Sequence, residues 1–263
     1  MSAAAALAFA AASAIAGEFS LQGVPQARME YEGTGFRQTP NGWELKVKPW
    51  TPAAGFRWRA SVTPKLAWQA QYWVNRSAYF MEDGNTQAGP LRQTGQTRQS
   101  LEALWVDLRR PLGGSSVEAV AGVHGVHQSF RRKSIVFNTL PEAETALDTQ
   151  TGAGLHLGFH ARRGPREGRP GYWEGEVLLG HLVWTRNNNP TEGGSIHRGG
   201  YTYAVRLEAG RVFGRARLGL GYTRQLYEIL VPGGRALPTG AAASLPINKT
   251  DFFGPYLSLG WTY

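Results

Sequence analysis

Hydrophobic and polar residues alternate with a period of two along most of the chain. Near the C-terminus, Leu257, Leu259 and Trp261 share one parity with the final residue, Tyr263, whereas small or hydroxylated residues such as Ser258 occupy the other. Because successive side chains of a β-strand point to opposite faces, this pattern predicts strands with one apolar face and one polar or small face. The expected fold is therefore all-β.

Strand length and connection length both distinguish this chain from a soluble sandwich. Segments such as 172–186 and 215–229 exceed a usual soluble strand, and they fit the ~9 to 11 residues that cross a bilayer at a tilt. Connections alternate between short ones, at 64–65, 111–116, 164–171 and near 213–214, and long ones, at 81–98, 131–149, 187–199 and 231–250. Outer-membrane barrels show this asymmetry, with tight periplasmic turns and long extracellular loops.

The chain resembles Gram-negative outer-membrane β-barrel proteins over nearly its whole mature length. In that family the last strand ends in an aromatic residue that the barrel-assembly machinery reads, with hydrophobic residues at alternate positions before it. Leu257, Leu259, Trp261 and Tyr263 match this assembly signal, although the family often has Gly where this chain has Ser258. The resemblance implies a transmembrane antiparallel up-and-down β-barrel in the bacterial outer membrane. It also implies contacts with outer-membrane lipid and lipopolysaccharide, and with the assembly machinery during biogenesis.

Composition agrees with export. The 263 residues include no cysteine, and the net charge of +9 is scattered over strands and turns rather than clustered as in nucleic-acid-binding proteins. Residues 1–16 are uncharged, rich in Ala and end in Ala14-Ile15-Ala16, so they are predicted to form a signal peptide cleaved before Gly17. They lack an initial Lys or Arg, and the alternative is a short buried helix. Residues 17–263 would then form a single barrel domain.

The pattern leaves the number of strands at about ten, with twelve as the alternative. Alternating segments occur near 43–50, 56–64, 66–80, 99–110, 117–131, 149–163, 171–186, 200–212, 215–230 and 252–263. The stretch 27–36 also alternates but is left over, and bacterial single-chain barrels have an even number of strands. Either a further strand, with 133–137 as the best candidate, makes twelve, or the N-terminal segment 17–42 lies outside the barrel wall.

Charged residues on the polar parity are expected to face the lumen, because a lipid-facing Arg or Lys at mid-membrane costs about 2 to 4 kcal/mol. The residues expected inside are Lys46, Lys48, Arg57, Arg59, His156, His160, Arg162, Arg206, Arg215 and Arg217, with Glu44, Glu174, Glu176 and Glu208. If matched in pairs, they would fill a closed barrel with a structural or surface-interaction role. If the basic residues are in excess and hydrated, they would line a porin-like channel of low conductance for small anionic solutes. The excess of inward basic residues favours the channel.

The histidines offer little further chemistry. His156 and His160 share a face, but their Cα atoms are about 13 Å apart, too far to bind one metal ion without help, so neither a metal nor a cofactor is expected. His127 and Ser129 faintly resemble the His-x-Ser pair of outer-membrane lipid A deacylases, with Glu142 or Glu144 as an orienting acid. That family usually has Asn where this chain has Phe130. A lipid hydrolase is therefore the least favoured function, and an enzyme is not expected.

Overall fold

The computed structural model of the chain describes residues 17–33, 50–77, 80–85, 92–113, 116–137, 140–165, 169–189, 193–197, 199–229 and 247–263. Ten long strands form the barrel wall: β1 (Gly17–Gly33), β2 (Trp50–Thr63), β3 (Leu66–Arg76), β5 (Arg92–Pro111), β6 (Val117–Phe137), β7 (Leu140–Arg163), β8 (Gly171–Asn189), β10 (Gly200–Phe213), β11 (Ala216–Ile229) and β12 (Ile247–Thr262). Two short strands, β4 (Phe80–Asn85) and β9 (Gly193–His197), pair with β5 and β8.

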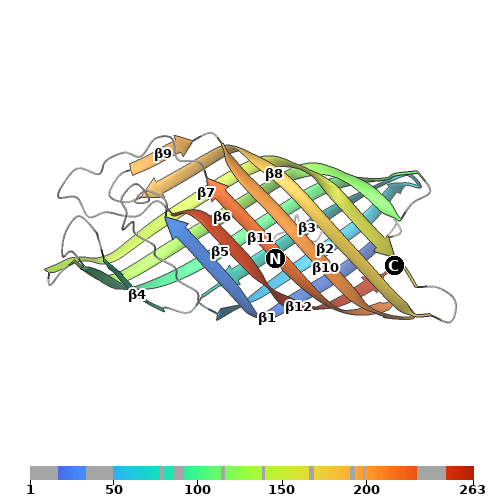
Figure 1. Ribbon diagram of the computed structural model, residues 1–263, viewed down its shortest axis with the longest axis horizontal. Coiled ribbons are helices and arrows are strands. Elements are labelled where there is room, and N and C mark those ends of the chain that lie inside the picture. Colours follow the sequence, from blue (N-terminus) through green and yellow to red (C-terminus); the bar gives the residue numbers. More distant parts are fainter. Residues whose placement is uncertain are drawn as a thin grey trace.

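The wall closes on itself, as Figure 1 shows. Each wall strand pairs antiparallel with the next along the chain, β10 pairs with both β8 and β11, and β12 pairs back onto β1 with Leu259 opposite Leu21. Closure satisfies the backbone groups that an open sheet would leave at its edges, which a bilayer requires because lipid offers no hydrogen bonds. The predicted all-β up-and-down barrel of ten strands is confirmed.

The first strands differ from those predicted. Residues 17–33 form β1, which is hydrogen-bonded to both β12 and β2, so this segment belongs to the wall rather than lying outside it. The predicted strand 43–50 lies outside the described residues except for Trp50, which is the first residue of β2 as described. Hydrophobic spacing left β1 out of the ten predicted strands, because small and polar residues such as Ser20 and Gln22 occupy its lumen face.

One end of the barrel carries short connections and both ends of the described chain. The turns join β2 to β3, β5 to β6, β7 to β8 and β10 to β11. Gly214 adopts a positive φ of 61° in the last of these turns, a conformation that favours glycine. At the same end, the Gly17 amide donates to the Tyr263 carbonyl at 3.3 Å and the Tyr263 amide to the Gly17 carbonyl at 3.1 Å. We call this the turn end; it corresponds to the predicted periplasmic side.

The opposite end, which we call the loop end, is more regular than predicted. The expected loop 131–149 is largely strand, because β6 and β7 continue pairing as far as Phe137 opposite Leu140. Residues 133–137 are therefore part of β6 rather than an additional wall strand. Parts of the expected loops 81–98 and 187–199 likewise form the β4–β5 and β8–β9 pairs (Figure 1).

Apolar side chains cover the outside of the wall. On β7, the outward residues Leu155, Leu157 and Phe159 are 58%, 68% and 60% exposed, whereas His156 and His160, on the other parity, point inward and are buried. Exposing such side chains to water costs roughly 1.5 to 3 kcal/mol each relative to burial, so hydrocarbon is the solvent that suits this surface. Among the described residues, no helix is long and apolar enough to cross a bilayer.

Charged residues mark both limits of this apolar belt. At the turn end, the outward positions of β7 and β10 reach Arg163 and Arg211, which are exposed. Toward the loop end, Glu102 on β5 and Arg224 on β11 are the first outward charges. Aromatic residues gather near these limits, among them Trp173 and Trp261 at the turn end, as expected of interfacial girdles. The belt therefore has the architecture of a membrane-spanning barrel wall.

Candidate functional site

The barrel interior holds a network of charged side chains, which begins at the turn end. Glu18 of β1 lies 2.5 Å from Arg217 and 3.5 Å from Arg162, measured between carboxylate oxygen and guanidinium nitrogen. These three side chains retain 27%, 12% and 42% of their accessible surface. The outermost layer of the network is therefore hydrated through the mouth of the barrel.

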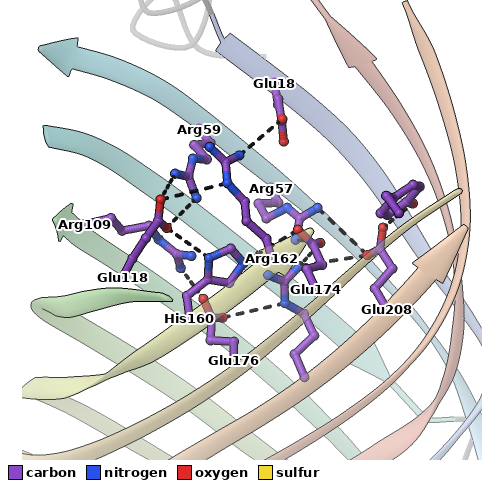
Figure 2. A network of polar contacts seen from close by, with 12 residues as sticks. Glu18, Arg57, Arg59, Arg109, Glu118, His160, Arg162, Glu174, Glu176 and Glu208 are labelled. Atoms are coloured by element: carbon purple, nitrogen blue, oxygen red, sulfur yellow. Dashed lines mark hydrogen bonds and ion pairs between the residues drawn. The ribbon is translucent and has the colours of Figure 1, made fainter. Parts of the chain in front are cut away.

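A second layer joins strands on opposite sides of the lumen. Arg59 donates two hydrogen bonds to Glu118, at 2.9 and 2.5 Å, and Arg57 donates to Glu174 (Figure 2). His160 lies between the two carboxylates, with Nδ1 3.0 Å from Glu118 and Nε2 3.6 Å from Glu174. All five side chains are buried and cannot be hydrated. The charged groups among them are instead stabilised by oppositely charged partners.

Arg109 lies deeper and has no accessible surface. It donates two hydrogen bonds of 3.1 Å to Asp107, its neighbour on the same face of β5, and a third to Glu176 on β8. Arg206 continues the network, with nitrogen-to-oxygen distances of 3.2 Å to Glu174 and 3.6 Å to Glu176. The ion pairs thus tie β2, β5, β8 and β10 together across the lumen.

Glu208 is the centre of a cluster of hydroxyl groups. It accepts hydrogen bonds from Tyr172 at 2.7 Å and from Tyr256 and Ser258 at 2.8 Å. The Arg217 guanidinium lies 4.1 Å from the centre of the Tyr172 ring, within cation–π range. Ser258, the departure from the assembly-signal pattern, therefore has a local role, because a glycine there could not bind Glu208.

Positive and negative groups are equal in number among the described members of this network. Six arginines and six carboxylates take part: Arg57, Arg59, Arg109, Arg162, Arg206 and Arg217 with Glu18, Asp107, Glu118, Glu174, Glu176 and Glu208. The excess of inward basic residues expected from the sequence is therefore absent from the described network. Three of the six carboxylates were not among the predicted inward acids: Asp107 and Glu118 lie on strands that were predicted, and Glu18 lies on β1, which was not.

An aromatic layer follows the charged network toward the loop end. Trp105 precedes Asp107 on β5, and Phe252 precedes Ser258 on β12, so both lie further from the turns. Trp73 contacts Phe252 with ring centres 6.0 Å apart, and Trp105 contacts Tyr227 at 6.3 Å. All four rings are at most 2% exposed. This layer therefore places four buried aromatic rings inside the barrel.

Two buried histidines border the aromatic layer. His124 stacks on Trp105 with ring centres 4.5 Å apart, and its Nε2 lies 3.0 Å from the Thr202 hydroxyl. His156 contacts Trp105 edge-on at 4.9 Å, and its Nε2 lies 3.9 Å from Asp107. No group of three or more His, Cys, Asp or Glu residues in the described part of the chain is arranged to hold a metal ion.

The structure places most of the predicted lumen residues inside the barrel. Arg57, Arg59, His156, His160, Arg206 and Glu208 are buried there, and Arg162 and Arg217 line the mouth. Arg215 is a correction: it lies in the exposed turn before β11, where its carbonyl accepts from the Thr262 amide at 2.9 Å. Lys46, Lys48 and Glu44 lie outside the described residues.

Sequence reasoning missed Arg109, Asp107, Glu118 and Glu18. The signal for the first two was present, because an apolar row of Leu104, Val106 and Leu108 on the outer face puts Asp107 and Arg109 on the inner one. The assembly-signal residues Leu257, Leu259 and Trp261 are exposed on the outside, next to Tyr263. Their recognition by the assembly machinery remains a prediction.

His127 and Ser129 lie on the outside of β6, near the loop-end limit of the belt. His127 Nδ1 is 2.9 Å from the Thr151 hydroxyl on β7, and Ser129 Oγ is 2.6 Å from Ser100 Oγ on β5. The side chains of Glu142 and Glu144, the predicted orienting acids, lie outside the described part of the structure; along β7 the two positions precede Thr151 by nine and seven residues.

Comparison with known proteins identifies the fold but no family. No family model matches the chain, and no curated protein matches it. Among solved structures, the outer membrane protease OmpT from Escherichia coli is similar with a TM-score of 0.56 at 9% identity, over 94% of this chain and 97% of that one. The translocator domain of the autotransporter NalP from Neisseria meningitidis gives 0.44 at 10% identity, over 99% and 96%. A deletion mutant of the TodX monoaromatic hydrocarbon channel gives 0.27 at 9% identity, over 94% and 90%.

At 9% identity the likeness to OmpT shows a shared fold and nothing about activity. The closed ten-stranded wall, its apolar outer belt and its two unequal ends define the class: this chain is a Gram-negative outer-membrane β-barrel.

Proposed function

We propose that the protein is a closed outer-membrane barrel, whose role is structural or depends on its surface rather than on passage through its lumen. The observation that supports this proposal is the burial of the inward side chains. A water-filled channel would leave accessible surface on the groups that face it. Arg109, Glu176 and Glu208 instead retain at most 2% of their side-chain surface.

The pairing of charges points the same way. An anion channel needs hydrated, uncompensated cations, whereas here the described arginines of the network each face one or more carboxylates. Such a network stabilises the barrel only as a complete set, because one unpaired charge in this environment is costly. The aromatic layer, on the loop-end side of the charged network, would add a second barrier to passage through the lumen.

The shape of the loop end suggests where a surface role would reside. The strands β6 and β7 have 21 and 24 residues, against 14 in β10 and β11, so their hairpin extends well beyond the apolar belt. A rigid hairpin projecting from the extracellular side is suited to contact with molecules outside the cell.

Planar-bilayer recording of the refolded protein tests closure directly. We expect the native barrel to give no resolved current steps. Replacing Trp73, Trp105 and Tyr227 by Ala removes three rings of the aromatic layer but leaves the charged network in place, so this variant should also give no current steps when heat-modifiable gel migration shows a folded barrel. Anion-biased steps from the native protein would instead establish the low-conductance channel and overturn closure.

A lipid hydrolase is the second candidate, favoured by the surroundings of His127. Its Nδ1 is held by Thr151, and Ser129 lies two residues further on the same lipid-side face. In the reaction, Ser129 Oγ would attack an ester carbonyl of an outer-leaflet lipid while His127 takes its proton and passes it to the leaving alkoxide; water would then release the acyl group.

The hydrolase is tested by acyl release from outer-membrane lipids. Ser129→Ala should abolish release, whereas Ser100→Ala, which removes only the hydrogen-bond partner of Ser129, should retain most of it. If the native protein releases no acyl chains, this candidate is eliminated.

A further inference from the structure

A row of hydrogen-bonding side chains crosses the outside of the barrel at the loop-end limit of the belt. His127 of β6 is directly opposite Thr151 of β7, which is directly opposite Arg186 of β8. We call these three residues the donor row. All three face outward: Arg186 is exposed, and His127 and Thr151 are half-buried, while the neighbouring Thr185 is fully buried. Neighbouring strands are about 4.8 Å apart, so the row is compact enough for one anionic group to contact two of its members.

An apolar groove lies on the same three strands, further toward the turn end than the donor row. It has a volume of about 560 Å³, and its outward lining is Ala121, Leu155, Leu157, Leu179 and His181. Ala121 lies on the β6 side of the groove, opposite Leu157, and its small side chain leaves space beside the leucines of β7 and β8, which are 58% to 68% exposed. From Thr151 to Leu157 the strand β7 advances six residues, or about 20 Å. At a tilt of 35–45° this spans roughly 15 Å of depth, about one leaflet.

We propose that this face binds one phosphorylated lipid of the outer leaflet, with an acyl chain in the groove and its phosphate at the donor row. The guanidinium of Arg186 is a planar donor that matches phosphate geometry, and hydroxyl and imidazole groups complete the contact. At this depth, a lipid-facing surface meets lipid headgroups, and phosphate is their common anionic group.

The charges around the donor row decide which side the phosphate occupies. On β5, Glu102 is opposite His127 and accepts a hydrogen bond from Tyr72 at 3.1 Å, so the β5 side is negative. On the β8 side, Arg186 has no carboxylate partner among the described residues. Arg131 is exposed on the same face of β6, four residues beyond His127, and adds positive charge above the row. The phosphate is therefore expected between Thr151 and Arg186, on the loop-end side of the groove.

The proposal is independent of whether the lumen conducts. It is tested by native mass spectrometry of the detergent-refolded barrel with two probes that share their acyl chains, dimyristoyl phosphatidic acid and dimyristoylglycerol. We expect the phosphorylated lipid to bind more tightly. Arg186→Ala should weaken that binding about tenfold or more, the loss of one charge-assisted hydrogen-bonded contact.

Two further variants separate the phosphate contact from the groove. Arg211→Ala removes an exposed arginine on the outside of the turn end and should leave binding unchanged. Ala121→Trp fills the groove without altering charge and should weaken binding of both lipids. Equal binding of the two lipids, an equal effect of Arg211→Ala and Arg186→Ala, or unchanged binding by Ala121→Trp would each overturn the proposal. Heat-modifiable migration of every variant confirms that the barrel is folded.

Discussion

At the scale of single residues, burial of charge is the dominant feature. Arg109 is fully buried on the inner face of β5, and its hydrogen bonds to Asp107 and Glu176 replace the water it has lost. Its neighbour Arg110 points outward and is exposed. The two adjacent arginines therefore contribute differently to stability, because successive side chains of a strand point to opposite faces.

Arg109→Ala should leave Asp107 and Glu176 without their shared cation. We expect the free energy of unfolding to fall by about 3 to 5 kcal/mol, as when one partner of a buried ion pair is removed. Arg110→Ala should change it by no more than about 0.5 kcal/mol. Urea unfolding in lipid vesicles measures both, and similar losses in the two variants would contradict the proposed role of the network.

At the scale of elements, the tight turns restrict the backbone conformation of the residues within them. The β10–β11 connection is only two residues long, and Gly214 within it has a φ of 61°. Gly164, which follows β7 at the same end of the barrel, has no positive φ, and an added Cβ there would meet no atom within 4 Å.

Gly214→Ala should therefore destabilise the barrel by about 1 to 2 kcal/mol, the cost of the left-handed conformation for a residue with a Cβ. Gly164→Ala is the matched control and should be neutral. The same urea titration compares them, and equal stability of both variants with the native protein would show that this turn relaxes without strain.

At the scale of the whole molecule, the outer surface of the barrel passes from an apolar belt suited to lipid to a region suited to water along the barrel axis. On β7, the outward residue Leu157 lies in the apolar belt, whereas Leu147, also outward and 46% exposed, lies on the part of the strand that extends past it. The two positions share a strand, a face and a side chain, so they differ only in what surrounds them.

Leu157→Arg should destabilise the barrel in vesicles by about 2 to 4 kcal/mol, because it places a cation in hydrocarbon. Leu147→Arg should cost little, since that position faces water. Folding titrations in vesicles of fixed composition measure the difference. Equal costs, or a native protein that stays dispersed and folded in buffer without detergent, would mean that the belt does not lie in a bilayer.

The alternation of residues was sufficient to predict the fold class, the lipid-facing surface and the two unequal ends, because parity is a local property of each strand. It failed where a strand lacked a strong apolar face, as in β1, which was not counted among the predicted wall strands. The extension of the β6–β7 hairpin was only partly predicted: residues 131–149 were expected to form a loop, with 133–137 as a candidate strand, because local alternation does not show which strand such a segment continues.

The sequence by itself determined which way a side chain such as Arg57 or Leu157 points. Only the tertiary structure decided which charges meet, because the partners are far apart in the chain: Arg57 and Glu174 are separated by 117 residues, and Arg217 and Glu18 by 199. Those contacts depend on the stagger of ten strands around a closed wall, and no single strand carries that information. The same stagger matches six arginines with six carboxylates, and this match favours a sealed lumen over the expected anion channel.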